Sequence, residues 1–124
     1  MIRLAIFASG SGTNADNIAL HFLDNPEVDV SLIVTNNANA GVIERAKKFQ
    51  IPLLIVSKKE FSDAEALIGT LRKYNIDMII LAGFLLLVPE NLIEAFKGRI
   101  INIHPALLPL FGGKGFYGAN VHQK

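Results

Sequence analysis

The sequence predicts an α/β fold, a doubly wound and mostly parallel sheet of about five strands with helices on both faces. Short apolar segments rich in β-branched residues alternate with segments whose apolar residues recur at helical spacing. The first strand segment, residues 2–8, is apolar at nearly every position, as expected when helices cover both faces of a parallel sheet. A glycine-rich loop joins that segment to a helix. This order of elements is typical of doubly wound folds.

The individual elements follow from apolar spacing and from the turn residues between them. Strands are expected at 2–8, 28–34, 53–56, 78–82 and 100–104, each bounded by glycine, proline or polar turn residues. Helices are expected at 15–23, 41–49, 63–74 and 89–96. Ser62 is the expected cap of the third helix, and Pro89 lies near the start of the fourth. Residues 111–118 are expected to form a glycine-rich loop, and 119–124 the first turn of a helix.

Length and composition limit the classes of protein. A chain of 124 residues forms one domain and leaves no room for a second. The sequence has no cysteine, which excludes disulfides and a thiolate nucleophile. No apolar run approaches the ~20 residues of a membrane span, and no signal peptide is recognisable. We therefore expect a cytoplasmic protein without a membrane partner.

Charge is unevenly distributed along the chain. Residues 95–124 contain four lysines and arginines and no acidic residue. This excess indicates an anionic substrate nearby, but four charges are too few to indicate nucleic acid.

The glycine loop, residues 9–14 with the sequence SGSGTN, is the first candidate site. Glycines at 10 and 12 allow backbone N–H groups to converge, and the following helix presents its positive end, which favours a bound phosphate. The spacing fits neither the Walker A pattern nor the dinucleotide pattern, which requires glycine where this chain has Ala15. The alternative is a tight turn in which Asn14 caps the helix. We favour the phosphate site because the loop follows the carboxyl end of a strand.

Asn102 and His104 form the second candidate site. Side chains alternate along a strand, so these two point to the same face, and Pro105 ends the strand directly after them. The imidazole can act as a general acid or base, and the amide can donate a hydrogen bond to an oxyanion. We favour chemistry over a structural histidine here. His21 is expected at the surface, and His122 lacks a defined place.

The apolar segment 82–88 follows the fourth strand and is the third candidate. Such a loop is expected to pack against the core or to line a pocket, and the sequence does not separate these alternatives. The charged cluster Lys58, Lys59 and Glu60 is expected to be a solvated face. Metal binding is not expected, because cysteine is absent and no two histidines have ligand spacing.

Together the motifs resemble the phosphoribosylglycinamide formyltransferases, a family of folate-dependent enzymes of purine (IMP) biosynthesis with a Rossmann-like N-terminal part. The resemblance rests on SGSGTN at 9–14, AGF at 82–84, NIHPALLP at 102–109 and GKGFYG at 113–118, in register along the whole chain. It implies formyl transfer from 10-formyltetrahydrofolate to the amine of 5-phosphoribosylglycinamide. Neither a metal nor a tightly bound cofactor is implied.

The resemblance also assigns roles to residues. His104 would be the general acid and base, and Asn102 would stabilise the oxyanion and contact the folate. The substrate phosphate would be held by Gly12, Thr13 and Asn14. The folate pocket would be lined by Leu85, Leu86, Leu87 and Val88.

Two departures from the family accompany this resemblance. Arginines that the family commonly places near the folate tail and in the pterin loop correspond here to Ala64 and Leu86. Family members continue past the position of Lys124, so residues 1–124 are expected to form a single formyltransferase domain that lacks the family's C-terminal segment. That segment carries the aspartate that pairs with the catalytic histidine, and this chain alone is therefore expected to be poorly active. Its oligomeric state is left open between a monomer and a homodimer.

Two other functions remain to be weighed. A non-catalytic, Rossmann-type module for phosphate or nucleotide binding would need only the glycine loop. A nicotinamide dehydrogenase is disfavoured, because the third glycine of its pattern is missing and the second strand ends without an acidic residue.

Overall fold

The strands of the computed structural model, which describes residues 1–103 and 116–117, form one sheet in the order β3-β2-β1-β4-β5-β6. The first five are parallel, and β6 pairs antiparallel with β5. Their bounds are β1 (Ile2–Phe7), β2 (Val28–Thr35), β3 (Leu53–Ile55), β4 (Met78–Ala82), β5 (Ile100–Ile103) and β6 (Phe116–Tyr117). The predicted sheet of about five parallel strands is confirmed. The short β6 adds an edge strand where a glycine-rich loop was expected.

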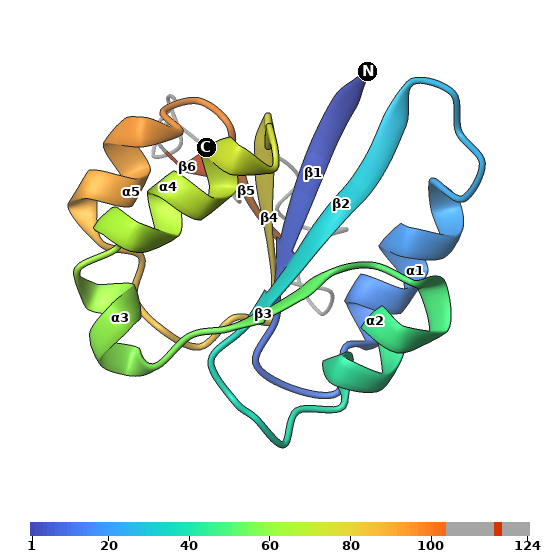
Figure 1. The fold of residues 1–124 in the computed structure, drawn as a ribbon, viewed down its shortest axis with the longest axis horizontal. Helices are drawn as coiled ribbons and strands as arrows, with labels where there is room; N and C mark the ends of the chain where they lie inside the picture. Colours follow the sequence, from blue (N-terminus) through green and yellow to red (C-terminus); the bar gives the residue numbers. More distant parts are fainter. Residues whose placement is uncertain (104–115, 118–124) are drawn as a thin grey trace.

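Helices cover both faces of this sheet, as Figure 1 shows. One face carries α1 (Thr13–His21) and α2 (Val42–Phe49). The other carries α3 (Lys58–Ser62), α4 (Glu65–Lys73) and α5 (Glu90–Ala95). The doubly wound α/β prediction is confirmed. No helix among the described residues is long and apolar enough to cross a membrane.

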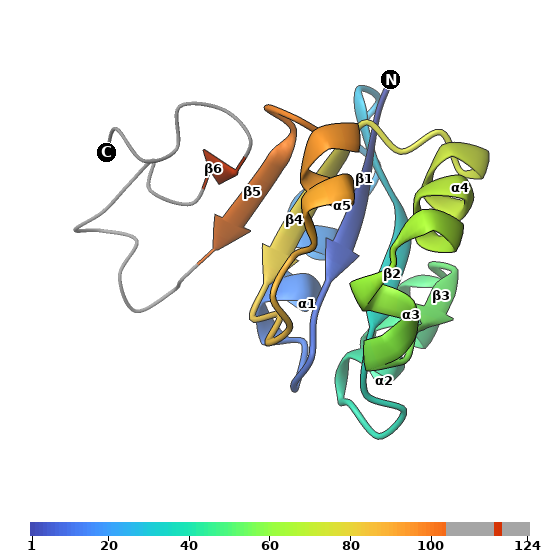
Figure 2. The ribbon, with the colours of Figure 1, turned by 90° about the vertical axis from the view of Figure 1, so that its left-hand side faces the viewer.

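The chain order changes direction between β1 and β4, the two central strands. From β1 the chain builds outward through β2 to β3, and it then returns to β4 on the other side of β1. The arrowheads of β1, β4 and β5 point to the same edge of the sheet (Figure 2). In open parallel sheets, the carboxyl edge at such a switch point is where ligands bind. The loops after β1 and β4 therefore mark the place where a site is expected.

Two apolar clusters fill the two sides of the sheet. The larger lies beneath α3, α4 and α5 and contains Phe7 and Phe61, both almost fully buried, with Phe84 packed against them. Their rings meet edge to face, with centroids 4.9–6.1 Å apart. The smaller cluster, beneath α1 and α2, consists largely of alanines with Ile6 and Ile33.

The predicted helix at 63–74 is wrong at its start. Ser57 caps α3 in a capping box, accepting a hydrogen bond from the Glu60 backbone while the Glu60 carboxylate accepts one from Ser57 N–H. The chain then turns, and α4 starts after Ala64. Ser62 is the last residue of α3 and caps nothing, because its hydroxyl donates to the Lys59 carbonyl. The exposure expected of Lys58, Lys59 and Glu60 is confirmed.

Candidate active site

The glycine loop lies between β1 and α1 and packs tightly against the start of α2. Gly12 is the N-cap of α1 and has a left-handed backbone, with φ 81° and ψ 17°. A Cβ added to it would lie 2.7 Å from the Val42 Cα. Only glycine fits this position without strain, both for its backbone angles and for its space. Asn14, the alternative cap, lies inside the helix instead.

The N-terminus of α1 has no capping side chain among the described residues. The first helical hydrogen bond runs from Asp16 N–H to the Gly12 carbonyl, at 2.7 Å. The amides of the turn before it have no intrahelical acceptor, as at the start of every α-helix. Hydroxyls of Ser11 and Thr13 lie 3.1 Å apart beside them. This concentration of donors at the positive end of a helix suits an anion such as phosphate.

Contacts from α2 hold the loop in this shape. The backbone N–H of Val42 donates to the Gly10 carbonyl at 3.2 Å. Arg45 Nε donates to the Ser11 carbonyl at 3.4 Å, and its guanidinium lies 3.5 Å from the Asp16 carboxylate. Lys48 reaches the same carboxylate at 3.3 Å. Arg45 and Asp16 were not predicted to take part in the site, because their ion pair joins two separate helices.

Asn102 lies on β5, at the same edge of the sheet. It is half-buried and is the register partner of Leu81 on β4. In-register neighbours of a parallel sheet share a face, so Asn102 faces the side covered by α3, α4 and α5. The predicted strand around Asn102 is therefore confirmed.

The structure tests the prediction for only one of the three histidines. His104 follows β5 directly but lies outside the described residues, as does His122, so the pairing of Asn102 with His104 stays a prediction. His21 is exposed at the end of α1, with its ring 4.7 Å from that of Phe22, and its predicted surface location is confirmed.

The 85–88 segment follows β4 and alternates between the core and solvent. Leu86 packs partly against the larger cluster, and Val88 is buried in it. Leu85 and Leu87 are 81% and 92% exposed. Of the two alternatives, packing against the core holds for Leu86 and Val88 and not for Leu85 and Leu87, and lining a pocket stays a prediction. These two present an apolar surface at the carboxyl edge of the sheet, beside the switch point.

The sequence profile of a family described as formyl transferase matches residues 2–124. The chain belongs to the formyl transferase family. It is 46% identical over 127 residues to a chloroplastic phosphoribosylglycinamide formyltransferase of Arabidopsis thaliana, a match that covers 98% of this chain and 44% of the relative. The Bacillus subtilis phosphoribosylglycinamide formyltransferase is 38% identical over 118 residues, covering 91% of this chain and 60% of the relative. The chain thus spans about half the length of these relatives.

Solved structures of the same kind of protein have the same fold. Phosphoribosylglycinamide formyltransferase from Anaplasma phagocytophilum superposes with a TM-score of 0.77 at 34% identity, over 84% of this chain and 50% of that one. Glycinamide ribonucleotide transformylase 1 from Geobacillus kaustophilus gives 0.77 at 38% identity, over 92% and 63%.

Two positions of this formyl transferase chain were expected to replace folate-binding arginines of the family. Ala64 is fully buried in the larger cluster, at the junction of α3 and α4. Leu86 also packs against that cluster. Both side chains therefore support the core.

Ser9 is the first residue of the glycine loop, and no role was predicted for its side chain. Ser9 is only 4% exposed, and its hydroxyl donates to Asn36 Oδ1 at 2.5 Å. The Ser9 Oγ in turn accepts a hydrogen bond from Leu85 N–H at 2.9 Å. A small polar residue directly after a buried strand was the only signal in the sequence. Its partners are 27 and 76 residues away along the chain, so only the tertiary structure brings them together.

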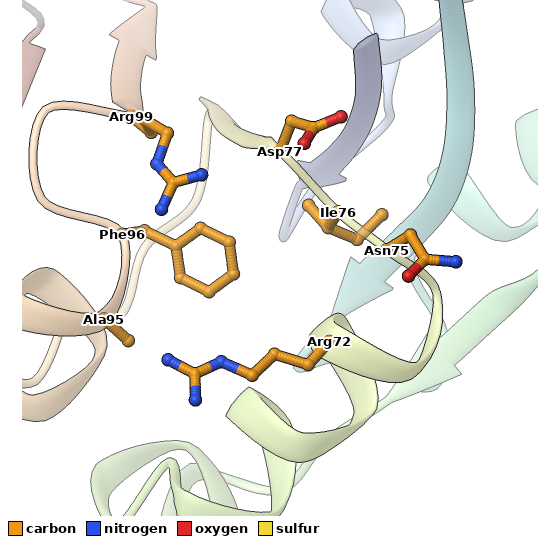
Figure 3. Close-up of a pocket in the computed structure, with 7 residues that line it drawn as sticks. All are labelled: Arg72, Asn75, Ile76, Asp77, Ala95, Phe96 and Arg99. Carbon is orange, nitrogen blue, oxygen red and sulfur yellow. The ribbon is translucent and has the colours of Figure 1, made fainter. Parts of the chain in front are cut away.

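A cavity of about 260 Å³ lies at the opposite edge of the sheet (Figure 3). The side chains of Arg72 and Arg99 flank the Phe96 ring there. Arg99 and Asp77 directly precede β5 and β4, so this cavity lies at the amino ends of those strands. It is separate from the glycine loop. Within the described part of the chain, no group of three or more His, Cys, Asp or Glu side chains could hold a metal ion.

Proposed function

We propose that this protein transfers a formyl group from 10-formyltetrahydrofolate to the amine of 5-phosphoribosylglycinamide, in the biosynthesis of the purine nucleotide IMP. The observation that carries the proposal is the family match over residues 2–124, together with relatives named for this activity. The arrangement at the carboxyl edge of the sheet supports it, because the glycine loop, the 85–88 segment and Asn102 all lie there.

The phosphate of the ribonucleotide would bind at Gly12, Thr13 and Asn14. The left-handed Gly12 and the uncapped start of α1 support this assignment, because they direct backbone N–H groups to one point. The nearby carboxylate of Asp16 is paired with Arg45 and Lys48, which limits its repulsion of a phosphate.

The folate would bind against Leu85, Leu86, Leu87 and Val88, with Asn102 nearby. Exposed leucines lose contact with water when a planar apolar ring covers them, and this favours binding by about 25 cal/mol for each Å² of apolar surface buried. The exposure of Leu85 and Leu87 supports this role. The folate is a co-substrate here, and the proposal requires no tightly bound cofactor.

The chemical step is attack of the glycinamide nitrogen on the formyl carbon. A tetrahedral intermediate forms, and its negative oxygen would accept a hydrogen bond from the Asn102 amide. His104 would take the proton from the attacking amine and deliver it to N10 of the folate. The bond between N10 and the formyl carbon then breaks, which releases tetrahydrofolate and the formylated amide.

Formyl transfer by the natural full-length protein, followed by tetrahydrofolate release, tests the proposal. Replacing His104 with Ala should lower kcat by about 10²–10⁴-fold, the usual contribution of a general acid–base. Asn102→Ala should lower it by about 10²–10³-fold, as for other oxyanion donors. His21→Ala is the matched control, because His21 is exposed on α1, and its activity should equal that of the wild type.

Absence of transfer by the wild type, with phosphate binding retained, would instead favour the non-catalytic binding module. Two further predictions accompany the proposal, a cytoplasmic location and no nucleic-acid partner. A homodimer is a candidate oligomeric state. The names of the Arabidopsis and Vigna unguiculata relatives place those proteins in the chloroplast.

A further inference from the structure

Ser9 joins three loops at the carboxyl edge of the sheet. It follows β1, its hydroxyl donates to Asn36 after β2, and it accepts from the backbone of Leu85 after β4. Its own N–H donates to the Gly83 carbonyl at 3.3 Å. A serine hydroxyl has one proton to donate and lone pairs to accept, and Ser9 uses both. These loops lie at the switch point of the sheet, where the glycine loop and the 85–88 segment meet.

The glycine loop and the 85–88 segment differ in the contacts that hold them, apart from those of Ser9. The glycine loop has independent support from α2, through Val42 N–H on the Gly10 carbonyl and Arg45 on the Ser11 carbonyl. In the 85–88 segment, Val88 is buried, Leu86 packs partly against the larger cluster, and Leu85 and Leu87 are exposed. Two hydrogen bonds tie its start to the loop after β1, Leu85 N–H on Ser9 Oγ and Ser9 N–H on the Gly83 carbonyl, and only the first needs the hydroxyl.

We propose that Ser9 is a positioning residue, whose hydroxyl fixes the 85–88 segment relative to the glycine loop and so keeps the binding sites of the two substrates in one geometry. This inference rests on the proposed function, because it assigns the phosphate to one loop and the folate to the other. Ser9 touches neither substrate. It acts through the backbone of Leu85 and through Asn36.

The effect of removing the hydroxyl is selective. In Ser9→Ala the Leu85 N–H loses its acceptor, while the contacts from α2 still hold the glycine loop. The backbone bond from Ser9 to Gly83 and the packing of Leu86 remain, so the segment shifts without being released. The KM for 10-formyltetrahydrofolate should rise about fivefold to tenfold, the effect of one hydrogen bond of ordinary net strength. The KM for the ribonucleotide should change less than about twofold, because its loop keeps its own contacts. General destabilisation would raise both constants together.

Three further variants of the natural full-length protein complete the experiment. Ser9→Thr keeps the hydroxyl and should restore the folate KM to within about twofold of wild type. Asn36→Ala removes only the acceptor of the Ser9 proton and should give a smaller rise of the folate KM. Ser31→Ala is the matched control, because Ser31 is also a buried serine, bonded to a side chain at 2.5 Å (Asp29 Oδ2) on β2. It should change neither KM.

Amide hydrogen exchange gives a readout that needs no substrate. The Leu85 N–H should exchange faster in Ser9→Ala than in wild type and Ser31→Ala, because it loses its acceptor. Unchanged Leu85 exchange, or equal rises of both KM values, would overturn the inference. If Ser9→Ala does not fold, the KM values of Asn36→Ala decide, because the Ser9 hydroxyl then loses the acceptor that orients it; an unchanged folate KM in that variant would overturn the inference. If the wild type transfers no formyl group, the proposed function fails, and the exchange measurement still tests whether Ser9 anchors the segment.

Discussion

The two faces of the sheet are packed with side chains of different size. Beneath α3, α4 and α5, phenylalanines and leucines interdigitate to form a deep core. Beneath α1 and α2, alanines predominate, and the helices can approach the sheet and each other closely. Large side chains bury more apolar area, whereas small ones permit close backbone contact.

This difference matches what each face does. The face with small residues brings the start of α2 against Gly12 and Ser11, which fixes the backbone amides of the glycine loop. The face with large residues supports the 85–88 segment through Phe84, Leu86 and Val88, and it leaves Leu85 and Leu87 exposed. The face beneath α1 and α2 therefore fixes the backbone of the glycine loop, and the face beneath α3, α4 and α5 contributes most of the buried apolar area. The two faces should respond to opposite kinds of substitution.

Truncating a large side chain should be most costly on the face with large residues. Phe61 is almost fully buried and contacts the rings of Phe7 and Phe84. Phe61→Ala should lower the free energy of unfolding by about 3–5 kcal/mol, measured by urea denaturation of the full-length protein. Tyr74→Ala, at a partly exposed position, is the control. A loss below about 1 kcal/mol for Phe61→Ala would contradict the packing described for this face.

Adding a methyl group at Gly12 should be costly on the other face. Gly12→Ala meets both a left-handed backbone and the Val42 Cα at 2.7 Å. We expect a loss of stability of about 2–4 kcal/mol, together with weaker phosphate binding in a calorimetric titration. In the same loop, Gly10 has no atom within 4 Å of an added Cβ, so Gly10→Ala should leave stability nearly unchanged. Equal effects at the two glycines would refute the close approach of α2.

Enlarging an alanine beneath α2 also tests how tightly the face with small residues is packed. Ala46 on α2 is 1% exposed within the smaller cluster. Ala46→Leu should destabilise the protein by about 1–3 kcal/mol, because the added atoms force α2 away from the sheet. Thermal unfolding measures this, with the neighbouring exposed position, Lys47→Leu, as control. A stabilising Ala46→Leu would reveal unfilled space beneath α2.

The smallest expected effect is at the start of α3, which lies outside both clusters. Ser57→Ala removes the N-cap hydroxyl and should cost about 1 kcal/mol of stability. Ser62→Ala is the control, because the Ser62 hydroxyl caps no backbone N–H. Equal losses in the two variants would argue against Ser57 as the cap.

The capping box at Ser57 also makes the stability of the protein depend on pH. Hydrogen bonds from the Ser57 backbone, and then from its side chain, lower the pKa of Glu60 below its ordinary value. The folded state therefore favours the carboxylate, and this stabilisation is present above the unfolded pKa and lost as pH falls through the folded pKa. The difference in unfolding temperature between wild type and Glu60→Gln should shrink in that acidic range. A difference that stays constant would show that the charge of Glu60 does not contribute.

Local pattern was sufficient for most of the fold. Apolar runs and turn residues located β1, β2, β4 and β5, because buried parallel strands need continuous apolar sequence. It failed at residues 58–64, where a capping box starts a short helix and a second turn interrupts it before α4. The charges at 58–60 predicted only a solvated face there, and Phe61 and Ala64, which pack into the core, give too short an apolar pattern to indicate a separate helix.

The sequence by itself determined the alternation of strands and helices, the glycine loop after β1 and the position of Asn102 on β5. Each of these depends on residues close together along the chain. Only the tertiary structure decided that Val42 requires glycine at position 12, that Leu85 and Leu87 are exposed, and that Ser9 joins Asn36 to Leu85. Those contacts connect residues far apart in sequence, and they exist because the sheet brings the carboxyl ends of its strands to one edge.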